Sequence, residues 1–269
     1  EKILSLPDRV KNQYSLATMH TLICAAAPAT PELKRATNGF FRSRGCPKNV
    51  FTEFYGSSEI AASSVLMPAD YEEKPERYES VGKIRCAETR IYDKETGAWC
   101  PPGKDGSVLS RSLTTLNLDY VGSAEKASRS FTFVDGLAWF DDGLRGRMDE
   151  DGFLYLTGRE KEMIITGGVN VFPNEIETAI KRHGKVLDVA VIRYPDKVLG
   201  EVPAAIVQPK DGAALSDHEI IEFCREQRLV GYKIPRYVEI VSALPRHIDG
   251  KMSKKELEDK YWEGIERRG

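Results

Sequence analysis

The sequence has 269 residues, more than a single domain usually holds, so two structural units are expected. Its 39 basic and 41 acidic residues give a net charge of −2, which offers no electrostatic reason to expect nucleic acid or an anionic membrane as the main partner. The five cysteines are odd in number and include no CxxC pair, so neither a disulfide framework nor a zinc site is indicated, and a cytoplasmic location is expected.

A short strand and a helix are predicted near the start of the chain. Residues 20–25 are apolar enough for a buried strand, and the small residues that follow, Ala26, Ala27 and Pro28, permit close approach by a flat ligand. A helix is expected next, with Thr30 as its N-cap. The apolar stripe of this helix is predicted at Leu33, Ala36 and Phe40.

Residues 50–59 combine a strand with a turn rich in hydroxyl groups. The stretch 50–55 predicts the strand, and the sequence Gly-Ser-Ser-Glu follows at residues 56–59. Hydroxyls, a free backbone N–H and a carboxylate within one turn suit a phosphate and the metal ion that shields it. The same four residues also fit the capped start of a helix, so both interpretations stay open at this point.

The middle of the chain predicts a loop and then a small β-structure. Residues 71–80 are rich in Glu, Lys and Pro and are expected to form a solvated loop. Three short strands are predicted after it, at residues 81–84, 89–93 and 106–110, with Gly and Pro in the turns between them. They indicate a small β-barrel or a distorted sheet.

Residues 153–173 are predicted to contain two short strands, a glycine turn and the start of a helix. Two predicted strands, residues 153–156 and 162–166, flank a charged joint. Gly167 and Gly168 end the second strand, and Pro173 suits the first turn of a helix. On spacing alone, this pattern also fits a hairpin and a turn at a domain border.

The last part of the chain alternates strands and helices. Strands are expected at residues 186–194, 202–208 and 237–241. Ser216 and Ser253 are each followed three residues later by Glu, which is the capping-box signature of a helix start. A unit of about 110 residues with these elements can bury its own core.

Residues 157–177, TGREKEMIITGGVNVFPNEIE, resemble the hinge and glycine-loop signature of the adenylate-forming enzymes, the superfamily of acyl-CoA synthetases, peptide-synthetase adenylation domains and luciferases. The sequence of this segment is most similar to that of acyl- and aryl-CoA ligases. The resemblance implies that Arg159 contacts the ribose of a nucleotide and that Lys161 is the hinge of a rotating small domain. It also implies that Gly167 and Gly168 line a narrow tunnel for the pantetheine arm of coenzyme A.

Two segments extend the resemblance toward the start of the chain. Residues 25–33, AAAPATPEL, are similar to the family's GGAPL…PEL, whose small residues line the adenine pocket; Ala26, Ala27 and Pro28 take that role here, with Ala in place of Gly. Residues 55–59, YGSSE, are similar to the YGxTE motif. By that likeness, four residues are nucleotide- or metal-binding: the ring of Tyr55 borders adenine, Gly56 belongs to the same turn, Ser58 meets the phosphate and Glu59 helps to hold magnesium.

A further segment extends the resemblance toward the end of the chain. Residues 244–252, LPRHIDGKM, are similar to the family's LPRTxxGKI and follow GYKIPRY at the expected distance. The resemblance makes Lys251 catalytic, as a mobile charge that stabilises the transferring phosphate and carboxylate. The alternative for Lys251 is an ordinary solvated surface lysine.

One motif departs from the family pattern. Residues 139–152, WFDDGLRGRMDEDG, match WFxTGDxGxxDEDG without gaps, but Leu144 stands where the motif's aspartate binds both ribose hydroxyls. Loss of a charged hydrogen bond costs about 1.5–3 kcal/mol. Asp142, in place of the motif's threonine, is expected to bind the ribose instead, and a degraded site is the alternative. Leu144→Asp is therefore expected to tighten ATP binding unless Asp142 already serves.

The resemblance implies an α/β (α+β) fold in two parts. Residues 1–158 would be the C-terminal part of the large AMP-binding domain, including a small β-barrel subdomain, and residues 159–269 a small mobile α+β domain. The family's upstream phosphate loop, SGTTGxPKG, is absent from the sequence, so these residues alone are expected to be inactive.

The implied activity is that of an ATP-dependent acid–CoA ligase. A carboxylic acid attacks the α-phosphorus of ATP to give an acyl-adenylate and pyrophosphate, and the acyl group then passes to the thiol of CoA. The implied cofactors and co-substrates are ATP/AMP, Mg²⁺ and coenzyme A. Glu59 and Lys251 would act in the first step, through the metal and the developing charge respectively.

Three other functions stay open. The acyl group could pass to a carrier protein or to oxygen instead of CoA, or the chain could be a noncatalytic descendant that binds nucleotide or a partner. A nucleic-acid module is a distant third, since its basic cluster is limited to Lys251, Lys254 and Lys255. Neither GxSxG nor HExxH occurs. No membrane span is expected because no apolar run reaches roughly 18 residues, and no signal peptide is expected because residues 1–7 lack its form.

Overall fold

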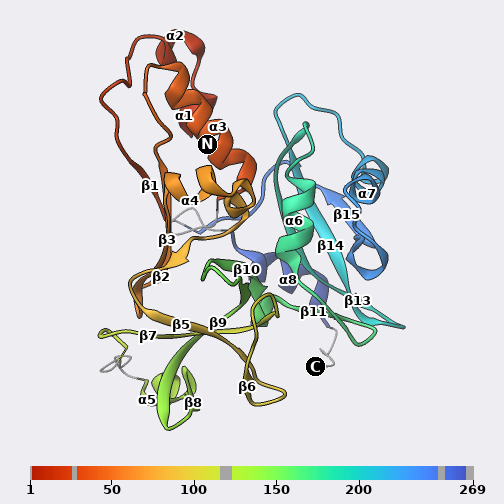
Figure 1. Ribbon diagram of the computed structural model, residues 1–269. Coiled ribbons are helices and arrows are strands. Elements are labelled where there is room, and N and C mark those ends of the chain that lie inside the picture. The colour runs from red at the N-terminus through yellow and green to blue at the C-terminus, as the bar shows by residue number, and fades with distance from the viewer. Residues whose placement is uncertain (1, 26–28, 116–122, 248–251, 265–269) are drawn as a thin grey trace. The chain divides into compact units, whose positions relative to one another are not determined.

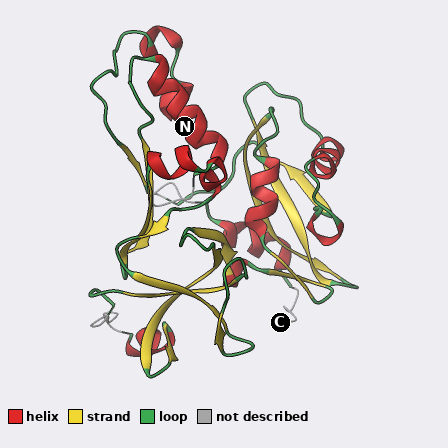
Figure 2. Cartoon of the chain, viewed as in Figure 1, coloured by secondary structure: helices red, strands yellow, loops and turns green. Residues whose placement is uncertain are grey.

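The computed structural model describes residues 2–25, 29–115, 123–247 and 252–264. The chain divides into two compact units, Glu1–Leu156 and Thr157–Gly269. Each unit combines helices with sheets, as Figures 1 and 2 show. The predicted mixed α/β fold class is therefore confirmed.

The first sheet of the first unit contains its parallel strand pair. In spatial order its strands are β1 (Leu22–Cys24), β2 (Phe51–Ser57), β3 (Ala61–Leu66) and β4 (Lys83–Ile84). β1 and β2 run parallel, and β3 and β4 continue the sheet antiparallel. Helix α3 (Pro31–Ser43) is the crossover that a parallel pair requires. Thr30 caps it as predicted, because the Thr30 hydroxyl accepts the N–H of Leu33 at 3.2 Å.

The buried face of α3 differs from the predicted stripe. The helix buries Lys34, Thr37, Asn38 and Phe41, whereas Ala36 is exposed. The side-chain oxygen of Asn38 accepts the N–H groups of Val50 and Phe51, both at 3.0 Å. Polar side chains face inward because neighbouring backbone and side-chain groups satisfy their hydrogen bonds.

Residues 71–80 form helices instead of the predicted solvated loop. Helix α4 (Pro68–Glu73) and the 3₁₀-helix η1 (Pro75–Glu79) cover this stretch. Tyr71 and Tyr78 are buried and stack with their ring centroids 4.2 Å apart. The prediction was wrong because the two aromatic side chains outweigh the charged composition around them.

The second sheet of the first unit is an open half-barrel of antiparallel strands. Its main path is β10 (Leu154–Arg159), β9 (Leu137–Met148), β7 (Gly106–Arg111), β5 (Glu88–Asp93) and β6 (Ala98–Trp99), and β8 (Phe131–Val134) pairs with β9. Short helices α1 (Lys2–Ser5), α2 (Asp8–Lys11) and α5 (Ala124–Arg129) complete the unit.

Strand β9 carries a bulge that is central to the site. Ser107 pairs with Arg145 and Leu109 with Asp141, so residues 142–144 lie opposite a single residue of β7. Gly143 has φ +73°, a conformation that glycine adopts without strain. The bulge therefore allows side chains near residue 142 to leave the regular alternation of the strand.

The second unit is a sheet covered by helices on both faces. Its strands are ordered β12 (Val169–Val171), β11 (Ile164–Thr166), β14 (Gly200–Pro209) and β13 (Val186–Asp196), and β15 (Tyr237–Ile240) pairs with β14. Its helices are α6 (Pro173–Ile180), α7 (Asp217–Glu226) and α8 (Lys254–Trp262), with 3₁₀-helices η2 (Glu160–Glu162) and η3 (Gly231–Lys233).

Alternating residues of β13 and β14 contribute their side chains to two separate hydrophobic cores, one on each face of the sheet. Val191 and Ala205 pack with α6 and α7, whereas Ile192 and Ala204 pack with residues of α8. The strands are apolar on both sides because both sides are buried. Helix α7 begins as predicted, since Ser216 accepts the N–H of Glu219 at 3.2 Å.

Candidate functional site

A hydrogen bond joins two predicted nucleotide-binding residues that lie far apart in the sequence. The hydroxyl of Tyr55, on β2, donates to Oδ2 of Asp142, in the β9 bulge, at 2.8 Å. Both side chains are half-buried. The fold thus places a carboxylate directly beside the ring that the sequence assigned to adenine.

The position of Leu144 explains why its side chain offers no ligand contact. Leu144 is 8% exposed and packs in an aliphatic cluster with Val108 and Leu154. Its backbone N–H donates to Oδ1 of Asp142 at 3.1 Å, so the bulge holds the carboxylate in place. A carboxylate at position 144 would be buried among aliphatic groups, so Leu144→Asp is expected to cost stability, and its effect on ATP binding stays a prediction. Asp142 is the informative position to change.

Gly56 and Ser57 end β2, and Ser58 and Glu59 begin the tight turn into β3, so the helix-start interpretation is wrong. The Ser57 hydroxyl accepts the N–H groups of Glu59 and Ile60, at 3.3 and 3.4 Å. Ser58 is exposed and Glu59 is half-buried. A Cβ on Gly56 would lie 1.8 Å from the carbonyl oxygen of Ala61, so only glycine fits there.

Glu59 is the candidate magnesium ligand. Within the residues that the structure describes, no three His, Cys, Asp or Glu side chains gather into a metal-binding cluster. Mg²⁺ usually keeps several waters and binds through one or two carboxylates together with substrate phosphates. A single half-buried carboxylate next to the turn that is predicted to bind phosphate fits that mode of binding.

A buried ion pair lies beside the predicted adenine-binding segment. The ammonium of Lys34 is 2.5 Å from Oε2 of Glu53 and donates to the carbonyl of Ser80 at 2.8 Å. Lys34 is 1% exposed and Glu53 2%. Burial lowers the pKa of Lys34 below its ordinary value, and Glu53 opposes that shift. Oε1 of Glu53 accepts the N–H of Ala29, the first described residue after the predicted adenine-binding segment, at 2.9 Å.

No local sequence signal marks this pair, because a lysine in a helix and a glutamate in a strand are expected to be solvent-exposed until their partner is known. The residues of the segment itself, Ala26, Ala27 and Pro28, lie outside the described residues. Their predicted contact with adenine stays a prediction.

In the second unit, Gly167 and Gly168 form the two-residue turn of the β11–β12 hairpin. Thr166 pairs with Val169 across the turn. The two glycines have φ +55° and +84°, and positive φ at both central residues is what a type I′ turn requires. Both are exposed. The turn therefore presents backbone without side chains.

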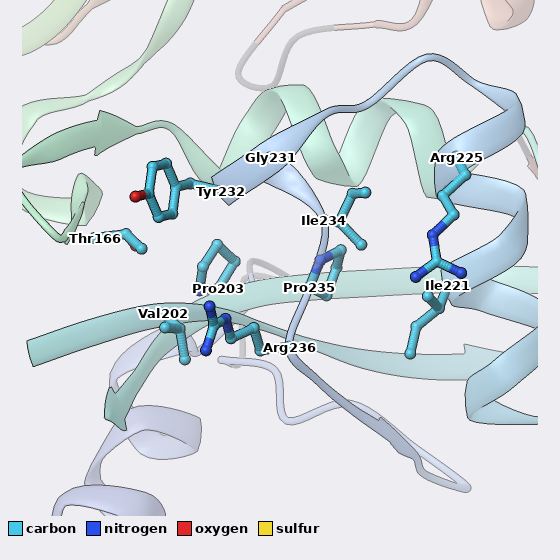
Figure 3. A pocket seen from close by; sticks show the side chains of 10 residues that line it. All are labelled: Thr166, Val202, Pro203, Ile221, Arg225, Gly231, Tyr232, Ile234, Pro235 and Arg236. Atoms are coloured by element: carbon cyan, nitrogen blue, oxygen red, sulfur yellow. The ribbon is translucent and has the colours of Figure 1, made fainter. Parts of the chain in front are cut away.

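A cavity of about 440 Å³ lies next to this turn, wholly within the second unit. Figure 3 shows its lining residues, which include Thr166, Val202, Arg225, Tyr232 and Arg236. Within the described residues the hydroxyl of Thr166 is buried and has no hydrogen-bond partner. The cavity combines mostly apolar walls, one unsatisfied hydroxyl and two arginines, of which Arg225 pairs with Glu222 and Arg236 lies 3.9 Å from Asp196. The lining suits a ligand with a flat or aliphatic part, and an anionic group on it would share these arginines with their carboxylates.

Two of the three remaining predicted site residues, Arg159 and Lys161, lie near the start of the second unit. Arg159 ends β10 and is exposed, and Lys161 is exposed in η2. Lys251 lies outside the described residues. The roles of all three stay predictions.

The sequence matches the family described as AMP-binding enzyme over residues 1–117 and the AMP-binding enzyme C-terminal domain over residues 175–251. The peroxisomal OPC-8:0-CoA ligase 1 of Arabidopsis thaliana is 33% identical over 251 residues, which are 93% of this chain and 44% of the ligase.

Two solved structures are similar over nearly the whole chain. ATP-bound MatB from Rhodopseudomonas palustris superposes with a TM-score of 0.80 and 28% identity, over 98% of this chain and 49% of MatB. The amide bond synthetase McbA from Marinactinospora thermotolerans gives a TM-score of 0.80 and 28% identity, over 96% of this chain and 50% of McbA. The chain thus spans about half the length of these relatives, or less.

Among the residues described, no helix is long and apolar enough to cross a bilayer. The Arabidopsis relative is peroxisomal by name. The cytoplasmic location expected from the sequence stays a prediction.

Proposed function

The chain belongs to the AMP-binding, adenylate-forming enzymes, and on that premise we propose that the full-length protein is an AMP-forming acid–CoA ligase. Its substrates would be a carboxylic acid, ATP and CoA. The observation that carries the proposal is the Tyr55–Asp142 hydrogen bond, because it supplies a carboxylate beside the adenine-binding ring where the motif's own aspartate is replaced by Leu144.

In the first step, this chain's residues would bind and orient the nucleotide. The Tyr55 ring would pack on adenine, and Asp142 would accept the ribose hydroxyls. Ser58 would donate to a phosphate oxygen. Glu59 would hold Mg²⁺, which supplies charge neutralisation on the phosphates when it is bound. Lys251 would stabilise the negative charge that develops as the acid attacks the α-phosphorus.

In the second step, residues of the second unit would guide the acceptor thiol. Rotation about Lys161 would withdraw Lys251 and bring the Gly167–Gly168 turn to the acyl-adenylate. A turn without side chains suits the narrow pantetheine arm of CoA. The neighbouring cavity, with Arg225 and Arg236 in its lining, supports binding of the anionic nucleotide end of CoA.

The test of the proposed function is ATP–pyrophosphate exchange by the full-length protein with fatty, aromatic and short-chain carboxylic acids. Exchange that depends on one class of acid is expected, followed by thioester formation when free CoA is added. Thioester formation would fail if the acceptor were a carrier protein or, as in the similar McbA, an amine. ATP binding without any exchange would contradict the proposal and support a noncatalytic nucleotide-binding protein.

Asp142→Ala is expected to weaken ATP binding about ten- to a hundredfold, because charged hydrogen bonds contribute about 1.5–3 kcal/mol. Isothermal titration calorimetry of ATP measures the change. Asp141→Asn is the matched control, since Asp141 pairs with Lys94 at 2.7 Å and bonds the N–H of Gly143. Equal dissociation constants for wild type and a folded Asp142→Ala variant would show that this carboxylate does not bind the ribose.

A further inference from the structure

Lys254 is the first residue of α8, a position that disfavours positive charge. The N-terminus of a helix carries a partial positive charge, so a cation there is destabilising unless it has partners. The Lys254 ammonium lies 2.8 Å from Oε2 of Glu162 and 2.8 Å from Oε1 of Glu177. The side chain is 21% exposed. Lys254 is therefore held between two carboxylates, and their negative charges offset the unfavourable interaction of the ammonium with the helix N-terminus.

The two carboxylates belong to different parts of the second unit. Glu162 ends η2 and follows Lys161, the proposed hinge. Glu177 lies in α6, and its Oε1 also accepts the N–H of Val191 in β13 at 2.7 Å. Lys254 thus connects the turn after the hinge to the central sheet of the unit.

Lys254 also stands at the base of the loop that contains Lys251. The base is closed by an antiparallel bridge between Arg246 and Met252. In addition, the N–H of Ser253 donates to the carbonyl oxygen of Pro245 at 3.0 Å. Ser253 makes no side-chain capping bond to α8, contrary to the capping box predicted from the sequence. The Lys254 side chain is therefore the contact that fixes this end of the helix to the hinge turn.

The rest of α8 is anchored separately. Nε and Nη2 of Arg193, on β13, donate to the two carboxylate oxygens of Glu258, at 3.1 and 2.7 Å. The indole N–H of Trp262 donates to the carbonyl of Arg193 at 3.0 Å. Removal of the Lys254 charge would therefore loosen the first turn of α8 while the helix stays docked.

We propose that Lys254 is a positioning residue, which fixes the base of the Lys251 loop to the hinge turn through Glu162 and to the sheet through Glu177. This role rests on the proposed function. When the small domain rotates, Lys251 and the hinge then move as one body, and Lys251 arrives at the nucleotide in one orientation. Misplacement of a catalytic group by about 1 Å can cost roughly a hundredfold in rate.

The test compares Lys254→Met with Lys254→Arg in the full-length protein. Lys254→Met is expected to lower ATP–pyrophosphate exchange about ten- to a hundredfold. Thioester formation from a supplied acyl-adenylate is expected to stay within about twofold, because Lys251 is withdrawn in that step. Lys254→Arg restores both carboxylate contacts and should recover most of the exchange. Equal losses in the two half-reactions would overturn the proposal.

Two controls separate positioning from folding. Lys255→Met removes the exposed neighbouring charge and should leave both half-reactions unchanged. Arg193→Met breaks the other anchor of α8, and its melting temperature shows how much of the loss follows from helix docking alone. At a comparable loss of stability, Lys254→Met must lose more ATP–pyrophosphate exchange, relative to thioester formation, than Arg193→Met does.

Amide hydrogen exchange provides a measurement that does not depend on activity. The Ser253 amide is expected to exchange at least about tenfold faster in Lys254→Met than in wild type. Its hydrogen bond to Pro245 can then break by local opening, without unfolding of the whole unit. Unchanged protection of this amide would overturn the positioning role. If the wild type shows no acid-dependent pyrophosphate exchange, the proposed function fails, and the Ser253 amide still decides whether Lys254 holds the loop base.

Discussion

Lys251→Ala is expected to lower the rate of acyl-adenylate formation by at least about two orders of magnitude, because loss of one preorganised stabilising group typically costs 10²–10³ in rate. Thioester formation from a supplied acyl-adenylate is expected to keep its wild-type rate. The physical reason is that Lys251 would lie beside the α-phosphate, where negative charge builds during attack by the acid, in the first step only. Rotation of the small domain would withdraw it before the second step, so it would stabilise one transition state and not the other. ATP–pyrophosphate exchange and a thioester assay measure the two half-reactions separately.

The control for this variant is Lys255→Ala, which removes an exposed lysine from the same segment. It tests whether the overall charge of the segment matters. Lys251→Arg adds a second comparison, because a planar guanidinium keeps the charge but not the compact geometry of an ammonium. If both half-reactions fell equally in Lys251→Ala, the assignment of Lys251 to adenylation would be wrong.

Lys34→Met is expected to destabilise the protein by about 3–5 kcal/mol, because it leaves the Glu53 carboxylate buried without its counter-charge. For a protein of this size or larger, each 1 kcal/mol shifts the melting temperature by about 2–4 °C or less. Urea unfolding gives the change in free energy directly. Ala29 loses part of its anchoring in the same variant, so the melting temperature and the ATP affinity are expected to fall together.

A double-mutant cycle separates the ion pair from the packing of the lysine stem. Lys34→Met combined with Glu53→Gln removes both charges and is expected to recover much of the stability that either single change loses. The matched control is the exposed pair between Glu125 and Arg129, whose side chains are 75% and 78% exposed. Its disruption should cost no more than about 0.5 kcal/mol. A similar small cost for Lys34→Met would show that the buried charges are not coupled.

Local signals predicted those parts of the fold that depend on local chemistry. Thr30 and Ser216 mark helix starts because a hydroxyl satisfies a free N–H within one turn. Gly167 and Gly168 mark a turn because positive φ favours glycine at both positions. These requirements lie within a few residues, and the sequence contains all of them.

Features that depend on distant partners could not be predicted in this way. The buried face of α3 contains Lys34 because Glu53 lies on a strand nineteen positions later. The helices at residues 68–79 form because Tyr71 and Tyr78 stack and share Asn38 as a hydrogen-bond partner. In the candidate site, the contact between Tyr55 and Asp142 depends on a bulge that only the strand pairing reveals.

Gly56, in the last part of β2, limits how this part of the chain can evolve. Because the position of the missing side chain is occupied by the Ala61 carbonyl, every other residue type is excluded whether or not a nucleotide binds. If Gly56 is conserved among diverging relatives, the steric requirement of the hairpin explains its conservation, and catalysis is not needed to explain it. Ser58 and Glu59, which meet no such steric limit, are the positions whose drift would show that a descendant had lost its ligand.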